Sequence, residues 1–194
     1  MNSVVIILTS IAVLLSILLI YLTNVDMKSV GAVAVFNTDA IKGEAVARVV
    51  GRSTHLDVVF TALPKGAHGF HIHTAGDLRG EGCKGACAHW HVGSAATAHG
   101  GPPGSPGPRH TGDLGNIEIP EGKTEFKAAY VLRGVSPADL WGRTLIIHAD
   151  PDDLGKGPHD DSHTTGHSGS RIGCAIFGRT MGCDGPAKRT TRKH

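Results

Sequence analysis

The chain has 194 residues, enough for one folded domain with its own hydrophobic core. Its formal net charge is only +2, so the overall charge gives no reason to expect nucleic-acid binding. Aromatic residues make up 5% of the chain against 27 glycines, a composition that favours many turns over long helices.

The first feature in chain order is the uncharged apolar stretch Val4–Leu22. Its 19 residues approach the roughly 20 that a helix needs to span a bilayer. No basic segment precedes it and no clear A-x-A cleavage site follows it, so we expect an uncleaved membrane anchor in preference to a cleaved signal peptide. A buried core helix is the other interpretation, although such a helix normally carries a polar stripe. Translation from Met27 would give a form without this segment.

From Val30 the sequence changes to short apolar runs separated by turn residues. Several runs alternate with the period of two that is typical of half-buried strands, and Asn37–Asp39 and Pro120–Gly122 have the composition of hairpin turns. About eight short strands without a convincing soluble helix predict an all-β sandwich or barrel. The expected strands are Val30–Phe36, Ala45–Val50, His55–Leu63, Gly69–His73, Leu114–Ile119, Glu125–Val131, Thr144–His148 and Cys174–Phe177.

Two long segments interrupt the strand pattern, Thr74–Asp113 and Ala149–Ser170. The first has 40 residues with ten glycines and four prolines, and the second is rich in Asp, His and Gly. Loops beyond about 12–15 residues in a compact domain are usually functional or disordered. We expect order, because metal ligands and a disulfide within the loops would supply it. The last residues, Asp184–His194, are interpreted as a solvated basic tail.

Histidine is the unusual residue type, with 11 of the 13 between His68 and His167. This density in a glycine-rich chain indicates metal ligation, with solubilising loop histidines as the open alternative. His71 and His73 end a predicted strand, where residues i and i+2 share a face. His148 ends another strand and is a candidate third ligand. The long loop adds His89, His91, His99, His110 and Asp113, and three histidines with one aspartate suit a closed zinc site.

The four cysteines are Cys83, Cys87, Cys174 and Cys183, and no two of them form a C-x-x-C pair. Zinc ribbons built on thiolates are therefore not expected. An even number of cysteines permits one or two disulfides, which would suit an oxidising compartment.

Six motifs stand in order along the chain: GFHIH at 69–73, HGGP at 99–102, HTGDLGN at 110–116, GRTLIIH at 142–148, DDLGKG at 152–157 and GSRIGC at 169–174. Together they resemble the copper/zinc superoxide dismutase family, over roughly Val30–Gly178. The resemblance implies an eight-stranded antiparallel Greek-key sandwich or barrel of immunoglobulin-like type with two long functional loops. It also implies an enzyme that converts superoxide to dioxygen and hydrogen peroxide by alternating reduction and oxidation of copper. The cofactors implied are one copper and one zinc ion per subunit.

The same resemblance assigns roles to individual residues. His89 is expected to bridge the two metals and to relay protons, with His91 as the rival, and His89 is preferred because it lies six residues after Cys83. Arg171 is expected to bind the superoxide anion beside copper, and Asp152 to orient two ligand rings by hydrogen bonds. The implied copper ligands are His71, His73, His89 and His148. The implied zinc ligands are His89, His99, His110 and Asp113.

The resemblance further implies a disulfide between Cys83 and Cys174. Cys87 and Cys183 are additional, and we expect them to pair, the alternatives being a link between chains or free thiols. Many relatives carry a lysine after the position of Asp160–Asp161 that guides the anion. Here His163–Thr164 stand in its place, which predicts weaker electrostatic steering.

We therefore expect three segments: a hydrophobic anchor or signal (1–26), a dismutase domain (27–180) and a basic tail (181–194). The expected partners are superoxide, a second copy of the chain, a copper chaperone and a membrane through residues 4–22, with no nucleic acid. Ala75 stands where relatives often place an aromatic residue at the dimer contact. The domain is expected to be membrane-anchored or secreted in an oxidising compartment, or cytoplasmic if translation starts at Met27. The alternative function is a non-catalytic copper-delivery or zinc-structural protein on the same fold.

Overall fold

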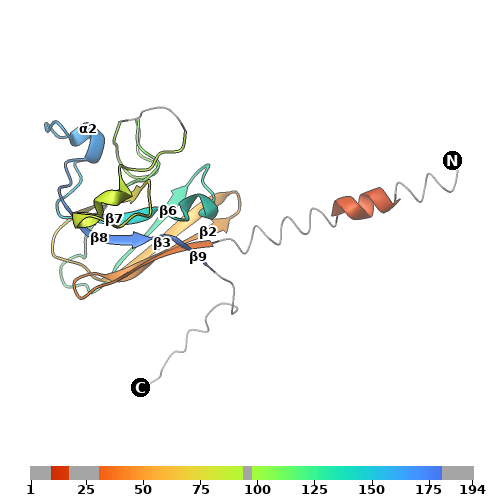
Figure 1. Cartoon of the computed structure of the whole chain (residues 1–194), viewed down its shortest axis with the longest axis horizontal. Coiled ribbons are helices and arrows are strands. Elements are labelled where there is room, and N and C mark those ends of the chain that lie inside the picture. The colour runs from red at the N-terminus through yellow and green to blue at the C-terminus, as the bar shows by residue number, and fades with distance from the viewer. Residues whose placement is uncertain (1–9, 18–30, 94–97, 181–194) are drawn as a thin grey trace, which may run out of the picture.

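The computed structural model describes residues 10–17, 31–93 and 98–180. In these ranges nine strands form two antiparallel sheets that face each other (Figure 1), which confirms the predicted all-β sandwich. One sheet has five strands in the order β6-β3-β2-β1-β9, and the other has four in the order β5-β4-β7-β8. The strands are β1 (Gly31–Asn37), β2 (Lys42–Val50), β3 (Ser53–Ala62), β4 (His68–His73), β5 (Asp113–Ile117), β6 (Phe126–Leu132), β7 (Thr144–His148), β8 (Arg171–Ile176) and β9 (Gly178–Arg179).

The structure differs from the predicted elements mainly at the C-terminal strand and in the loops. β8 begins at Arg171 and not at Cys174, and the chain crosses at Phe177 into β9, which pairs with β1 in the opposite sheet. Where no helix was predicted, the described residues contain three short helical turns: η1 (Glu81–Ala86), η2 (Pro137–Leu140) and α2 (Ser162–Thr165). Segments of four to six residues are too short to show a helical period in the sequence.

The predicted anchor falls largely outside the described residues. Residues 10–17 are helical, whereas 4–9 and 18–22 are not described. Among the helices that can be described, none combines the length and apolar character required to cross a membrane. Met27, Cys183 and the predicted tail over 181–194 also lie outside the described ranges.

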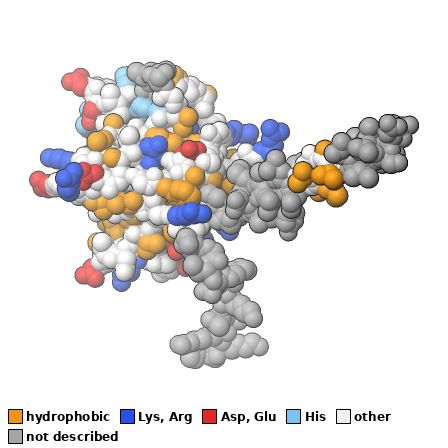
Figure 2. Space-filling view, turned by 45° about the vertical axis from the view of Figure 1, so that its right-hand side comes forward, with side chains coloured by type: hydrophobic (Ala, Val, Ile, Leu, Met, Phe, Trp, Pro, Cys, Tyr) orange, Lys and Arg blue, Asp and Glu red, His pale blue; other side chains and the backbone are white. Residues whose placement is uncertain are grey.

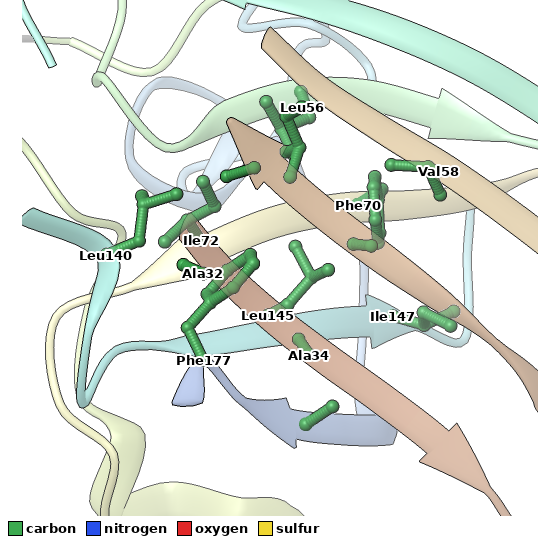
Figure 3. Close-up of a cluster of buried hydrophobic side chains, with 14 of the residues drawn as sticks. Ala32, Ala34, Leu56, Val58, Phe70, Ile72, Leu140, Leu145, Ile147 and Phe177 are labelled. Atoms are coloured by element: carbon green, nitrogen blue, oxygen red, sulfur yellow. The ribbon is translucent and has the colours of Figure 1, made fainter. Parts of the chain in front are cut away.

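The hydrophobic core fills the space between the two sheets (Figure 3). Alternate residues of β3 point into it, among them Leu56, Val58 and Phe60, each at most 1% exposed. Phe60 also contacts Phe70 of β4 edge to face, with ring centroids 5.9 Å apart. Burial of these aromatic rings, together with the Ala, Val, Leu and Ile side chains around them, holds the sheets together.

β4 and β7 differ from the other strands because every residue in them is buried. One face of each strand packs on the core, and the opposite face lies beneath the two long loops. The loops lie on the same side of the sandwich (Figure 1), where the His99 amide donates a hydrogen bond to the His163 carbonyl at 2.8 Å. The part of this outer face that carries His71, His73 and His148 is therefore enclosed, and these side chains are buried.

Candidate metal centre

The register between β4 and β7 gathers imidazole rings on the enclosed face. His71 lies opposite Ile146, so His148, two residues beyond, projects from the same face of the sheet. The ring centroids of His71 and His148 are 4.8 Å apart. An isolated bridge between His73 and His89 brings in the long loop, and the His89 ring lies 4.1 Å from that of His71.

Hydrogen bonds fix one nitrogen of three of these rings. His73 donates from Nδ1 to the Cys87 carbonyl at 2.7 Å, and His148 from Nδ1 to the Gly169 carbonyl at 3.2 Å. His71 donates from Nε2 to Asp152 Oδ2 at 2.8 Å. Since a carbonyl or carboxylate oxygen only accepts, each bonded nitrogen carries the proton and the other carries a lone pair.

The remaining ring nitrogens are the signature of a metal site. They are buried without a hydrogen-bond partner, a state that costs free energy unless a ligand compensates for it. A ligand atom from each of the four rings lies within 4.8 Å of the others. Four imidazole lone pairs in one place are a suitable ligand set for copper. The atoms are His71 Nδ1, His73 Nε2, His89 Nε2 and His148 Nε2.

A second ligand group surrounds one carboxylate oxygen. Asp113 Oδ1 lies 2.8 Å from His89 Nδ1, 3.0 Å from His99 Nδ1 and 3.2 Å from His110 Nδ1. The other oxygen, Oδ2, accepts hydrogen bonds from the amides of His110 and Gly100, at 2.7 and 3.0 Å. Three imidazole nitrogens around an anchored carboxylate fit a tetrahedral zinc ion.

His89 belongs to both groups, with Nδ1 on the Asp113 side and Nε2 on the side of His71, His73 and His148. His91 belongs to neither of the ligand groups found among the described residues. Its Nδ1 instead lies 3.4 Å from the Thr111 hydroxyl. The geometry thus gives the shared position to His89.

Asp152 links the two groups from behind. Its Oδ2 accepts from His71 Nε2 and its Oδ1 from His99 Nε2, both at 2.8 Å. Asn116 in turn fixes Asp152, because its side chain exchanges two hydrogen bonds with the Asp152 backbone, at 2.8 and 2.7 Å. One carboxylate therefore sets the orientation of a ring in each metal group.

Burial keeps the rings of the first group neutral. Desolvation lowers the pKa of His71 to about 3, of His73 to about 2 and of His148 to about 4. Burial also acts to lower the pKa of His99, but hydrogen bonds to Asp113 and Asp152 outweigh it and raise that pKa to about 9. At neutral pH the first group consequently offers unprotonated nitrogens to a metal ion.

Arg171 lies beside the first group, close enough that, besides burial, its positive charge helps to lower the pKa of His73 and His148. Its guanidinium donates to the carbonyls of Cys83 and Cys87, at 2.7 and 2.5 Å. A disulfide between Cys83 and Cys174, 91 residues apart, attaches η1 to β8 and confirms the predicted disulfide. Cys87 is exposed and pairs with none of the described cysteines. Arg171 also lines a cavity of about 500 Å³ with Glu81, Gly82, Lys84, Gly169 and Ser170.

Three supporting groups were missed from the sequence. Asn116 lies inside the HTGDLGN motif, so the motif contained a signal for it. Arg109 bonds to the Gly101 carbonyl at 2.9 Å and to the Asp113 carbonyl, which braces the zinc-side loop, and it lies in no motif. The Cys87 carbonyl accepts from both His73 and Arg171 and, as a backbone group, leaves no trace in the sequence.

Comparison with known proteins gives one consistent result. The sequence model Sod_Cu, described as copper/zinc superoxide dismutase (SODC), matches residues 40–177. A "Superoxide dismutase [Cu-Zn]" of Paramecium bursaria Chlorella virus 1 is 41% identical over 158 residues, covering 78% of this chain and 79% of the relative. An "Extracellular superoxide dismutase [Cu-Zn]" of Haemonchus contortus is 40% identical over 153 residues, covering 72% and 79%. The crystal structure of the clock protein EA4 superposes with a TM-score of 0.68 at 34% identity, covering 78% of this chain and 95% of the other.

Proposed function

The chain belongs to the copper/zinc superoxide dismutase family, and from this premise we propose which of its residues carry out the reaction. It is an enzyme that converts superoxide to dioxygen and hydrogen peroxide with copper and zinc as cofactors. When bound, copper supplies the reversible one-electron chemistry, while zinc, which has no accessible second redox state, supplies charge and order. The observation that carries the assignment is the set of buried ring nitrogens without hydrogen-bond partners.

We assign each metal ligand from the group into which its free lone pair points. The copper ligands are His71, His73, His89 and His148, and the zinc ligands are His89, His99, His110 and Asp113. Asp152 and the backbone carbonyls behind the rings hold the nitrogens on the required side.

His89 is assigned the proton transfer, at Nε2. This atom faces the copper ligands, whereas Nδ1 is engaged beside Asp113, so the ring stays in place while Nε2 takes up or gives a proton. Imidazole suits this task because its ordinary pKa lies near neutrality.

Arg171 is assigned the binding of superoxide. Two of its N–H groups are tied to the carbonyls of Cys83 and Cys87, which leaves other donors of the same rigid fork free for an anion. The charge is permanent and already positioned, so binding requires little reorganisation. Arg171→Ala should lower the rate and leave the metal content unchanged.

Steering of the anion is proposed to be weaker than in relatives that carry a lysine after Asp160–Asp161. His163 and Thr164 occupy that place, and both are exposed in α2. We expect a shallow dependence of the rate on ionic strength, measured between low and high salt. A steep dependence would refute this expectation.

The assignment of the ligands is tested by metal analysis and a superoxide-consumption assay on the full-length protein. The wild type should bind both metals and be active. His148→Ala should lose copper and activity but keep zinc, because His148 belongs only to the copper group. His91→Ala is the matched control and should keep both metals. A wild type that takes up zinc, refuses copper and leaves superoxide untouched would exclude the assignment and support a structural role.

We further propose the segment boundaries 1–26, 27–180 and 181–194, a membrane anchor through residues 4–22, a homodimer and loading by a copper chaperone. The Cys83–Cys174 disulfide and the relative named extracellular support an oxidising or extracellular location for the domain. Translation from Met27 would place a second form in the cytoplasm. Pairing of Cys87 with Cys183 is tested by intact mass after alkylation without reductant, where two free thiols would exclude it.

A further inference from the structure

A second group of histidines lies outside the metal centre, on the loop that carries α2. His159 and His167, here called the surface histidine pair, flank α2 and are both exposed. Their rings stack, with centroids 3.6 Å apart and planes inclined by 12°. Figure 2 shows histidine side chains at the surface near the top of the molecule, the end at which Figure 1 labels α2. Because His159 and His167 are exposed, a dissolved ion can reach them.

The contact between the rings shows that both side chains reach the same point in space. The stacked rings carry their lone pairs in nearly parallel planes, so one ring must turn before both can meet one ion. His159 is exposed and can turn about its side-chain bonds toward an ion on His167 Nε2, while Asp161 holds the His167 ring. Imidazole is the commonest ligand for divalent transition metals.

Asp161 prepares one of the two rings for this task. Its Oδ1 lies 2.6 Å from His167 Nδ1, so His167 donates from Nδ1 and keeps the lone pair on Nε2. In the buried centre, Asp152 acts on His71 in the same way. A carboxylate behind a ligating histidine fixes the ring and raises its basicity.

We propose that His159 and His167 bind one divalent ion of the zinc class, in addition to the two buried metals, with Asp161 as the positioning residue. Water completes the coordination, since the pair supplies two nitrogens. Every convergent group of three or more ligands among the described residues belongs to the buried centre. The surface ion is therefore held less tightly than the buried ones and is exchangeable.

An ion at this position would link the segment before α2 to the segment after it. The same loop is joined to the segment that holds Asp152, because the Asp153 amide donates to Gly166 at 2.9 Å and the Asp150 amide to Ser168 at 3.0 Å. Occupation of the site would thus steady the loop that orients His71 and His99.

The test is a calorimetric titration of full-length enzyme, both buried sites filled, with Zn²⁺. One further ion should bind to the wild type. His159→Gln and His167→Gln should each abolish this binding, and Asp161→Asn should weaken it by about tenfold through loss of ring orientation. His163→Gln removes another exposed histidine from α2 and is the matched control, which should bind like the wild type.

Hydrogen exchange gives a readout that does not depend on activity. Amides of residues 159–167 should exchange more slowly when the additional Zn²⁺ is present, in the wild type and in His163→Gln only. Absence of a third ion, or a third ion that survives in both His159→Gln and His167→Gln, would overturn the proposal. The copper and zinc content of each variant verifies that the buried centre has formed, so failure here is distinguishable from failure of the assigned enzyme site.

Discussion

The two faces of the four-stranded sheet are built from the same strands and do opposite things. Phe70 and Ile72 of β4 point into an apolar core, while His71 and His73 between and beyond them point into an enclosed polar layer. The side chains on the core face are packed against other apolar side chains. The metal face contains buried nitrogens that no protein group satisfies. Packing on the core face therefore stabilises the fold, whereas the unpaired nitrogens on the metal face cost stability and position the metal ligands.

The largest effect that separates the two faces is expected on acidification of the metal-free protein. In the unfolded chain, histidine gains a proton near its ordinary pKa of 6.5, whereas folding holds the pKa of His71, His73 and His148 at about 3, 2 and 4. Below pH 6.5 the unfolded state thus binds more protons, and stability falls as the pH falls. We expect the metal-free protein to be folded at pH 7 and largely unfolded at pH 4, as followed by circular dichroism.

His99 has the opposite effect on the pH dependence of stability, at alkaline pH. Because its pKa is raised to about 9, its contribution to stability is complete below pH 6.5 and is lost as the pH rises through 9. Metal-free stability should therefore pass through a maximum near pH 6.5. A curve without loss of stability between pH 6.5 and 4 would contradict the burial of neutral rings.

The next largest effect is expected from Phe70→Ala, which removes a buried side chain from the core face. Phe70 is fully buried and contacts Phe60, so we expect a loss of about 3–5 kcal/mol in the free energy of unfolding. Measured by denaturant titration, the change should appear with little effect on metal content at neutral pH. Val35→Ala is the control on an exposed site, with an expected change below about 0.5 kcal/mol.

The metal face is loosened without loss of the fold by Asp152→Asn. The carboxylate accepts from His71 with one oxygen and from His99 with the other, whereas an amide has a single oxygen to offer. One ring must lose its acceptor, and the affinity for metal should fall by about 10–100-fold. Competition with a chelator measures this fall. Asp150→Asn, an exposed neighbour, should leave the affinity as it is.

The smallest effect concerns the rim of the metal face. Lys84 is exposed and lines the cavity beside Arg171, so Lys84→Gln should reduce kcat/KM by about twofold at low salt and by less at high salt. Lys65→Gln, outside this cavity, should show no such dependence. An equal loss at every ionic strength would point to a structural role for Lys84.

The sequence predicted those features of the two faces that produce a short repeat or depend on a particular type of side chain. Alternation along the strands identified the sandwich, and His71, His73 and Asp113 followed from residue type and spacing. His148 and His89 were likewise candidate ligands from residue type and position in the sequence. The assignment of His89 to both metals came only from the family resemblance, because strand register and loop path depend on contacts across the chain. The two-residue β9 and the short α2 have too few residues to produce a pattern. The supporting carbonyl of Cys87 has no side-chain signature at all.

That carbonyl connects the disulfide to two side chains of the metal centre. Cys87 has a positive φ of 63°, and its oxygen accepts from both His73 and Arg171. The proposed copper ligand His73 and the proposed substrate-binding Arg171 thus share one acceptor, and Arg171 is held by the Cys83 carbonyl as well. The shared peptide plane lies four residues from Cys83, which forms the disulfide. If reduction of the disulfide freed that stretch, a rotation of this one plane would take the acceptor from His73 Nδ1 and one of the two acceptors from Arg171. Thiol reductants should consequently impair metal retention and substrate docking together, although no sulfur atom touches either.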